Sequence, residues 1–375
     1  MNKKLIITIG IVLGIVALGI AAYFAWHNRQ QIAQYIPGVG GGGQIPPAQQ
    51  MAKKITILSS QDVLEYWVAD FATSSDIFYI AKRGDLIHVD AAGKEDKIAT
   101  IKNGKDLWIK PSRDGKLFLM QQVGSSDQEM DVLDAKTGKT QAAFIGVVSA
   151  DWGPQPGILA VLQMQSENER IATNLMIADM LGKNTQPQKI MSFHQQDYDI
   201  QWIRDNQIIL MPKPASDIIS QAWTVDLKAK TMKQFVVGRG LMLSWAKFGD
   251  IGLKFSSLDG TTNKLMLIDS AGNKKTEFSF KTFPDKCAIV SPKQMYCAIS
   301  RDQDAFSAGV FPDDYLKRAV YFHDGLYNID FDKNSLQAVF EDNDPLIDAT
   351  HLMLMGTKLL FINRYDNKLY SLQLP

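Results

Sequence analysis

Few side chains in this sequence have the types and spacing that metal binding requires. The five histidines stand far apart, and no two of them have the spacing of zinc ligands. They are His27, His88, His194, His323 and His351. The segment 330–341 places Asp, Asp, Asn and Glu at ligand positions of a calcium-binding loop, but Ser335 stands where the sharp turn of that loop requires glycine. We therefore predict no metal site and no cofactor.

Two cysteines have the spacing of a cross-strand disulfide. Cys287 and Cys297 flank a short apolar hairpin with Pro292 near its centre, so they lie opposite each other if both arms are strands. Directly opposite Cα atoms in an antiparallel pair are about 4.5–5.5 Å apart, which a disulfide can bridge. The alternative is a pair of buried free thiols that pack as small apolar side chains.

The segment 301–318 departs from the regular pattern of the chain and mixes aromatic with charged side chains. Long loops on regular scaffolds often carry function, and this mixture suits recognition of a partner. We therefore predict a partner-binding loop with the candidate residues Phe306, Phe311, Asp313, Asp314, Tyr315 and Lys317. The alternative is an insertion that packs over the body of the protein, with its aromatic side chains as anchors.

Composition and motifs exclude several functions. The chain has 40 basic and 40 acidic residues, so it lacks the basic excess that is typical of nucleic-acid binding. It also lacks the G-x-S-x-G motif of an α/β-hydrolase nucleophile. No catalytic residue is predicted, and a role other than catalysis is favoured.

A repeat of about 40–45 residues organises the chain from residue 53 onward. A bulky residue, a turn and an apolar strand that starts six positions later recur seven times, most clearly at Trp152, Trp202 and Trp245. Short β-branched and aromatic runs separated by turn residues indicate strands throughout. This period with four strands per unit is typical of propeller blades. We therefore predict an all-β, seven-bladed β-propeller over residues 53–375.

A second series has the same period. A hydrophobic strand ends in aspartate six times, at Asp90, Asp134, Asp179, Asp226, Asp269 and Asp330. Because aspartate can accept hydrogen bonds from the backbone that follows it, each position predicts a turn. The last unit lacks an outer strand, while the apolar run Lys54 to Leu58 precedes the first unit. We predict that this run completes the last blade and closes the ring.

The tryptophans of the body have two interpretations. Five of them stand at or near predicted strands: Trp108, Trp152, Trp202, Trp223 and Trp245. Packing between blades would account for this placement. The alternative is an aromatic platform that binds sugars.

Two hairpins resemble a known repeat family. Pro111-Ser-Arg-Asp-Gly-Lys-Leu-Phe-Leu and Ser291-Pro-Lys-Gln-Met-Tyr-Cys look like the Ser-Pro-Asp-Gly-Lys hairpins of TolB-like, WD40-like propellers. The propellers of prolyl oligopeptidase-type peptidases are similar, but this chain has no room for their hydrolase domain. The resemblance implies the propeller fold and carries over no functional residue.

An uncharged apolar run, Leu5 to Trp26, precedes the repeats. Its 22 residues would span roughly 33 Å as a helix, enough to cross a bilayer. Lys3 and Lys4 lie before it, which favours a cytoplasmic N-terminus. A cleaved signal peptide is the alternative, although the run is long for one. The Gly/Pro-rich segment 27–52 is typical of a flexible tether.

These features together predict three parts and a location. Residues 1–26 anchor the chain in the cytoplasmic membrane, residues 27–52 form the tether, and residues 53–375 form the propeller outside, in the periplasm or at the cell surface. Such a module would act as a non-catalytic binder or scaffold for a protein, a peptide or a polysaccharide of the envelope. The alternative is a hydrolase or lyase with its active site in the propeller channel.

Overall fold

The computed structural model describes residues 55–71, 74–101, 107–122, 128–167, 170–182, 186–257, 263–342 and 344–375. The predicted membrane segment, Leu5 to Trp26, and the predicted tether, 27–52, lie outside these residues. Within the described ranges, no helix has both the length and the apolar character needed to cross a bilayer. The strands belong to one compact unit, Lys53–Pro375.

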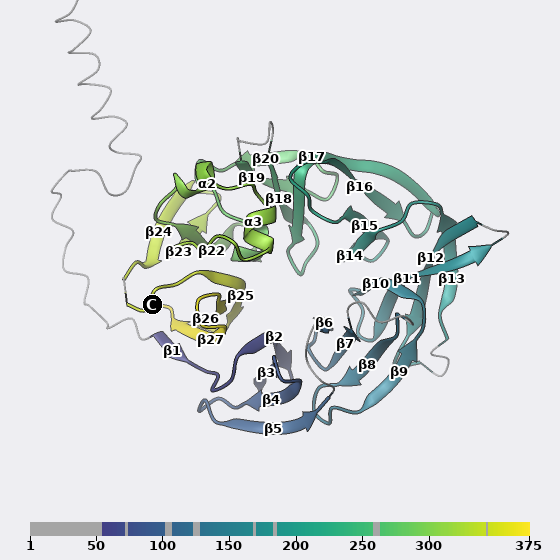
Figure 1. Cartoon of the computed structure of the whole chain (residues 1–375), viewed down its shortest axis with the longest axis horizontal. Coiled ribbons are helices and arrows are strands. Elements are labelled where there is room, and N and C mark those ends of the chain that lie inside the picture. The colour runs from purple at the N-terminus through teal and green to yellow at the C-terminus, as the bar shows by residue number, and fades with distance from the viewer. Residues whose placement is uncertain are drawn as a thin grey trace, which may run out of the picture. The chain divides into compact units, whose positions relative to one another are not determined.

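The strands form seven antiparallel blades around a central axis, each with its first strand toward the centre and its fourth at the rim (Figure 1). Blade 1 contains β2 (Val63–Asp70), β3 (Ser75–Ala81), β4 (Asp85–Val89) and β5 (Glu95–Thr100). Blade 2 contains β6 (Leu107–Pro111), β7 (Leu117–Gln122), β8 (Met130–Asp134) and β9 (Thr140–Phe144). Blade 3 contains β10 (Val147–Trp152), β11 (Ile158–Glu167), β12 (Arg170–Asp179) and β13 (Gln188–Phe193).

Blades 4 and 5 share one long strand, β17 (Thr231–Trp245), which is the outer strand of blade 4 and the inner strand of blade 5. Blade 4 begins with β14 (Tyr198–Arg204), β15 (Gln207–Pro212) and β16 (Ile219–Asp226). Blade 5 continues with β18 (Ile251–Ser257), β19 (Asn263–Asp269) and β20 (Lys274–Glu277). Blade 6 contains β21 (Cys287–Ser291), β22 (Gln294–Ser300), β23 (Asp324–Asp330) and β24 (Ser335–Phe340).

Blade 7 draws its strands from both ends of the described chain. Its first three strands are β25 (Ala349–Met355), β26 (Lys358–Asn363) and β27 (Lys368–Gln373), and its outer strand is β1 (Ile55–Ile57). Thr56 pairs with Ser371 in antiparallel register. The prediction that the run ending at Leu58 completes the last blade is therefore confirmed.

The core consists of seven apolar clusters, one between each pair of neighbouring blades. Tyr66 and Tyr79 of blade 1 pack against Leu360 of blade 7, so a cluster also fills the junction where the ring closes. A four-stranded sheet with two apolar faces cannot bury both alone, and stacking around an axis buries both. The predicted all-β propeller is confirmed.

The antiparallel order divides the connections between two faces of the ring. The hairpins between the first and second strands, and between the third and fourth, lie on one face, which we call the hairpin face (for example Arg113, Asp205 and Lys247). All other connections lie on the opposite face, the loop face (for example Ser216 and Tyr365).

The aspartates that were predicted to form turns do so on the hairpin face. In each case one carboxylate oxygen accepts one or two backbone N–H groups from two to four residues downstream, as Asp269 does from Ala271 and Asn273. The same turn chemistry holds at Asp90, Asp134, Asp179, Asp226 and Asp330. These bonds lower the pKa of Asp90 and Asp330 because they favour the charged carboxylate.

One long connection of blade 6 lies on the loop face. The insertion 301–323 contains two short helices, α2 (Ala305–Ala308) and α3 (Asp313–Leu316), and α3 lies toward the inner side of the ring (Figure 1). Asp313 accepts a hydrogen bond from the backbone of Ser216 in blade 4 at 2.9 Å, and Arg318 donates to Asn367 in blade 7 at 2.5 Å. The insertion therefore bridges part of the loop face from blade 4 to blade 7.

A buried charge cluster fixes the insertion to blades 6 and 7. Lys286, in the 3₁₀ turn η1 (Pro284–Lys286), lies 2.7 Å from Asp324 and 2.5 Å from Asp348, and all three side chains are at most 1% exposed. Arg364 binds Asp348 at 2.8 Å and donates to the carbonyl of Tyr315 in α3 at 2.7 Å. Burial alone would lower the pKa of Lys286, but the two carboxylates outweigh it and raise that pKa.

Candidate functional site

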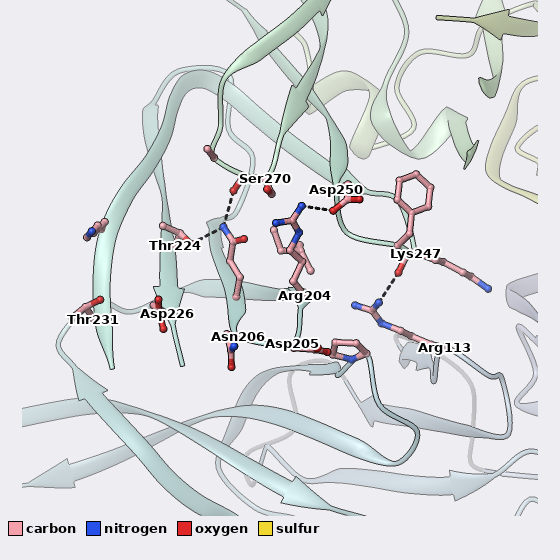
Figure 2. A pocket seen from close by; sticks show the side chains of 16 residues that line it. Arg113, Arg204, Asp205, Asn206, Thr224, Asp226, Thr231, Lys247, Asp250 and Ser270 are labelled. Atoms are coloured by element: carbon pink, nitrogen blue, oxygen red, sulfur yellow. Dashed lines mark hydrogen bonds and ion pairs between the residues drawn. The ribbon is translucent and has the colours of Figure 1, made fainter. Parts of the chain in front are cut away.

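A large cleft opens on the hairpin face at blades 4 and 5. It has a volume of about 1110 Å³. Its walls are hairpin tips from blades 2 to 5, so residues that are far apart in the sequence meet there (Figure 2). Arg204 and Asp250 stand in the middle of the wall, with Thr231 on one side and Arg113 on the other (Figure 2).

Hydrogen bonds within the protein hold several wall side chains in place. Gln207 of blade 4 donates to Thr224 at 3.1 Å and to the carbonyl of Ser270, in blade 5, at 2.7 Å. Arg204 forms an ion pair with Asp250 across the same junction. These bonds tie the tips of the two blades together at the cleft, so that the wall is preorganised for binding.

Arg113 reaches into this site from blade 2. Its guanidinium donates to the carbonyl of Lys247 at 2.6 Å and to the carbonyl of Trp202. Burial lowers the pKa of Arg113, while the carboxylates of Asp151 and Asp205 act in the opposite direction. This arginine therefore joins the tips of blades 2, 4 and 5.

A glycine permits the close approach of blade 5 to blade 4. Gly249 has φ +78°, in the left-handed region that other residues rarely adopt. A Cβ atom there would lie 2.0 Å from the carbonyl oxygen of Ile203. The tip that carries Lys247, Phe248 and Asp250 can therefore pack on blade 4 only with glycine at this position.

Several cleft side chains are available to a ligand. The side chain of Lys233 makes no hydrogen bond or ion pair with any described residue, and Asp205 is exposed near Arg113. Phe248 is 38% exposed, so an apolar ring lies beside these charges. The cleft thus offers a cation, an anion and an aromatic surface together.

The innermost strands carry charges that are paired between neighbouring blades. Lys110 of β6 lies 2.9 Å from Asp151 of β10, and His351 of β25 lies 3.6 Å from Glu65 of β2. Burial raises the pKa of Glu65, against the effect of His351 and of the Tyr66 N–H group. Across the described ranges, no three His, Cys, Asp or Glu side chains gather in the manner of metal ligands.

The residues of the predicted partner-binding loop fall into two groups, three buried aromatic residues and three polar residues that solvent reaches. Phe306, Phe311 and Tyr315 are 1–3% exposed and form an aromatic cluster with Phe283, whose ring stacks on Tyr315 with 4.0 Å between centroids. They anchor the insertion, so they offer no surface to a partner.

The polar residues of the same loop have different positions. Asp313 accepts from the Ser216 backbone, and Asp314 accepts from the backbone of Val310 at 2.7 Å within the insertion itself. Lys317 is exposed. Of the six candidate residues, these three are the ones that solvent reaches.

Cys287 and Cys297 face each other across the hairpin of β21 and β22. Their Cα atoms are 4.1 Å apart, and a disulfide joins them. Both side chains are buried, at 8% and 0% exposure. The bridge links the first two strands of blade 6 beside the cluster that carries the insertion.

The sequence contained a signal for the cleft that the predictions did not use. The repeat places the first hairpin of every blade on one face, and charged residues recur in those hairpins, at Arg113, Asp205, Lys247 and Lys293. The repeat does not indicate which blades leave a cleft between their tips, because that depends on contacts between blades, such as the one from Arg113 to Lys247.

The fold is similar to solved propellers. The C-terminal WD40 domain of Sif2 is 13% identical, with a TM-score of 0.52 over 86% of this chain and 99% of that one. An oligogalacturonate lyase in complex with manganese is 12% identical, with a TM-score of 0.57 over 87% of this chain and 94% of that one. The β-propeller domain of Cps50 (Swd1) from Myceliophteria thermophila is 9% identical, with a TM-score of 0.52 over 86% and 100% of the two chains.

At such low identities, these similarities show the fold alone. No family model and no curated protein matches the sequence. The neighbours therefore support a propeller of WD40-like form, and the function has to be inferred from the site.

Proposed function

We propose that this chain is a membrane-anchored, extracytoplasmic binding module that holds an extended segment of a partner protein in the hairpin-face cleft. The observation that carries the proposal is the cleft of about 1110 Å³ with fixed walls and available groups of both charges. A peptide has backbone donors and acceptors along its length and side chains of either charge. Lys233, Asp205 and the exposed ring of Phe248 complement those groups.

The apolar run Leu5 to Trp26 supports the anchored location, since it is long enough to cross a bilayer. The segment 27–52 would then give the propeller reach from the membrane. A buried cross-strand disulfide fits an oxidising compartment outside the cytoplasm. Carbonate extraction of membranes and protease treatment of spheroplasts, whose outer envelope has been opened while the cytoplasmic membrane is intact, test this part. Retention in the membrane and digestion from outside are expected, whereas a protected or extractable chain would contradict it.

Site-specific photo-crosslinking tests the binding surface. The full chain carries a photoreactive amino acid at Asn206 or Phe248 in the cleft, or at Leu336, which is exposed on the outer strand of blade 6. We expect a discrete adduct of one mass from both cleft positions and none from Leu336. Equal adducts from all three positions, or none from the cleft, would contradict the proposal.

A further inference from the structure

A second cavity opens on the loop face, beside the sector that the insertion bridges. Its volume is about 370 Å³, and the inner strands of blades 2, 3 and 4 form its walls. The side chains that matter below are Trp108, Gln121, Tyr198, Asp199 and Lys213. None of them takes part in the hairpin-face cleft.

The polar groups of this cavity are held in place with hydrogen-bonding capacity left over. The Gln121 amide donates to the carbonyl of Val147 at 2.7 Å, and its own oxygen accepts no hydrogen bond from a described residue. The indole of Trp223 donates to the Tyr198 hydroxyl at 3.2 Å, so the phenolic hydrogen is left to donate elsewhere. Gln121 and Tyr198 both line the cavity, so it contains residues with unused acceptor and donor capacity.

Lys213 lies in a loop that several contacts fix. Gly240 donates to the carbonyl of Ala215 at 3.1 Å, and Arg239 donates to the carbonyl of Asp217 at 2.9 Å. The insertion adds the bond from Ser216 to Asp313. The insertion therefore helps to position one wall of the cavity.

The charged side chains of this cavity indicate which class of ligand it can bind. Lys213 interacts electrostatically with Asp199, and Asp197 lines the same cavity, while the nearby Lys110 is already paired with Asp151. One cation against two carboxylates disfavours an acidic ligand. Burial raises the pKa of Asp199, and Lys110 and Lys213 oppose that rise.

A saccharide matches this set of groups. Each saccharide hydroxyl can donate one hydrogen bond and accept others. It can therefore pair with the Gln121 amide, the Tyr198 phenol and the Asp199 carboxylate. Its C–H face can pack on the half-buried indole of Trp108. We propose that the loop-face cavity is a binding subsite for a neutral saccharide, separate from the peptide cleft.

Saturation-transfer NMR and calorimetry on the full chain test this proposal, in a detergent without a sugar headgroup. The probes are cellobiose, maltose, N,N′-diacetylchitobiose and the acidic digalacturonate. We expect binding of at least one neutral disaccharide and at least about tenfold weaker binding of digalacturonate. No binding by any neutral disaccharide, or stronger binding of digalacturonate, would overturn the proposal.

Variants locate the binding. Trp108→Ala removes the platform, and Tyr198→Phe removes only the hydroxyl, so each should weaken binding about tenfold or more. Phe248→Ala in the hairpin-face cleft is the matched control and should leave saccharide affinity unchanged. Should Trp108→Ala fail to fold, Tyr198→Phe decides. Unchanged affinity in the folded cavity variants would overturn the proposal.

Discussion

Ile55 lies opposite Leu372 in an antiparallel ladder, although the two stand near opposite ends of the described chain. The contact continues beyond the strand, because Leu58 donates to the carbonyl of Leu369 at 2.8 Å. Lys368 then donates to the carbonyl of Ser60 at 2.8 Å. One short strand therefore holds the first and last blades in a single ring.

Deletion of residues 51–58 should destabilise the whole propeller. It removes the antiparallel pairing of β1 with β27 and the bond from Leu58 to Leu369. At about 1 kcal/mol for each hydrogen bond lost, a loss of a few kcal/mol is expected. Thermal unfolding followed by circular dichroism measures the effect, with deletion of residues 44–50 as the control. A melting temperature unaffected by the longer deletion would reject ring closure by this strand.

Gly249→Ala should cost more stability than Gly356→Ala. Both glycines have positive φ, +78° and +57°, so both variants bear the backbone cost of about 1 kcal/mol. Only at Gly249 would the new Cβ meet a backbone atom, the carbonyl oxygen of Ile203, while no atom lies within 4 Å at Gly356. Urea unfolding of the two variants checks this. Equal losses would show that blades 4 and 5 are not packed as described.

Lys286→Met should be strongly destabilising. It leaves the buried carboxylates of Asp324 and Asp348 without their shared cation, which typically costs about 3–5 kcal/mol. Lys293→Met is the control, since Lys293 pairs with Asp332 on the surface and should change little. Chemical denaturation measures both. A Lys286→Met protein as stable as Lys293→Met would refute the buried cluster.

Asp324 should give stability a pH dependence of unusual sign. Burial, with the Asp348 carboxylate, raises the pKa of Asp324 from 3.8 to about 6, against the pull of Lys286. The Asp324 carboxyl therefore binds a proton more tightly in the folded state than in the unfolded state. As the pH rises from about 4 to about 6, the contribution of Asp324 to the free energy of unfolding decreases. Asp324→Asn should remove that fall, as urea titrations across this range would reveal. If the free energy of unfolding changed with pH in the same way in the original protein and in Asp324→Asn, the raised pKa of Asp324 would be contradicted.

Repetition explains how much of the fold could be predicted from the sequence. Trp152 and Trp245 end inner strands and Asp269 ends a third strand, as their spacing indicates. The turn at Asp269 is a local feature, because its carboxylate accepts hydrogen bonds from the backbone within the next four residues. Local features of this kind can be predicted from the sequence. The closing strand was predictable for a related reason: the last unit lacked a strand and the first had one to spare.

Features that depend on contacts between distant segments were beyond sequence reasoning. The mixture of aromatic and charged residues in the insertion is compatible with an exposed loop and with a buried anchor. Phe283 lies outside the insertion in the sequence, but its ring stacks on Tyr315 of the insertion. This contact is the reason that the aromatic side chains of the insertion are buried. The cleft likewise depends on Arg113 reaching from blade 2 to Lys247 in blade 5, which no local pattern encodes.

The most direct test of the proposed function is the effect of charge reversal on capture of the crosslinked partner. Asp205→Lys and Lys233→Glu each invert one available charge of the cleft, and Lys293→Glu inverts a charge on the same face in blade 6. Adduct yield from a photoreactive residue at Phe248 is measured against partner concentration. We predict at least about tenfold weaker capture for the two cleft variants and unchanged capture for Lys293→Glu. Equal capture by all three variants would contradict a partner held in this cleft.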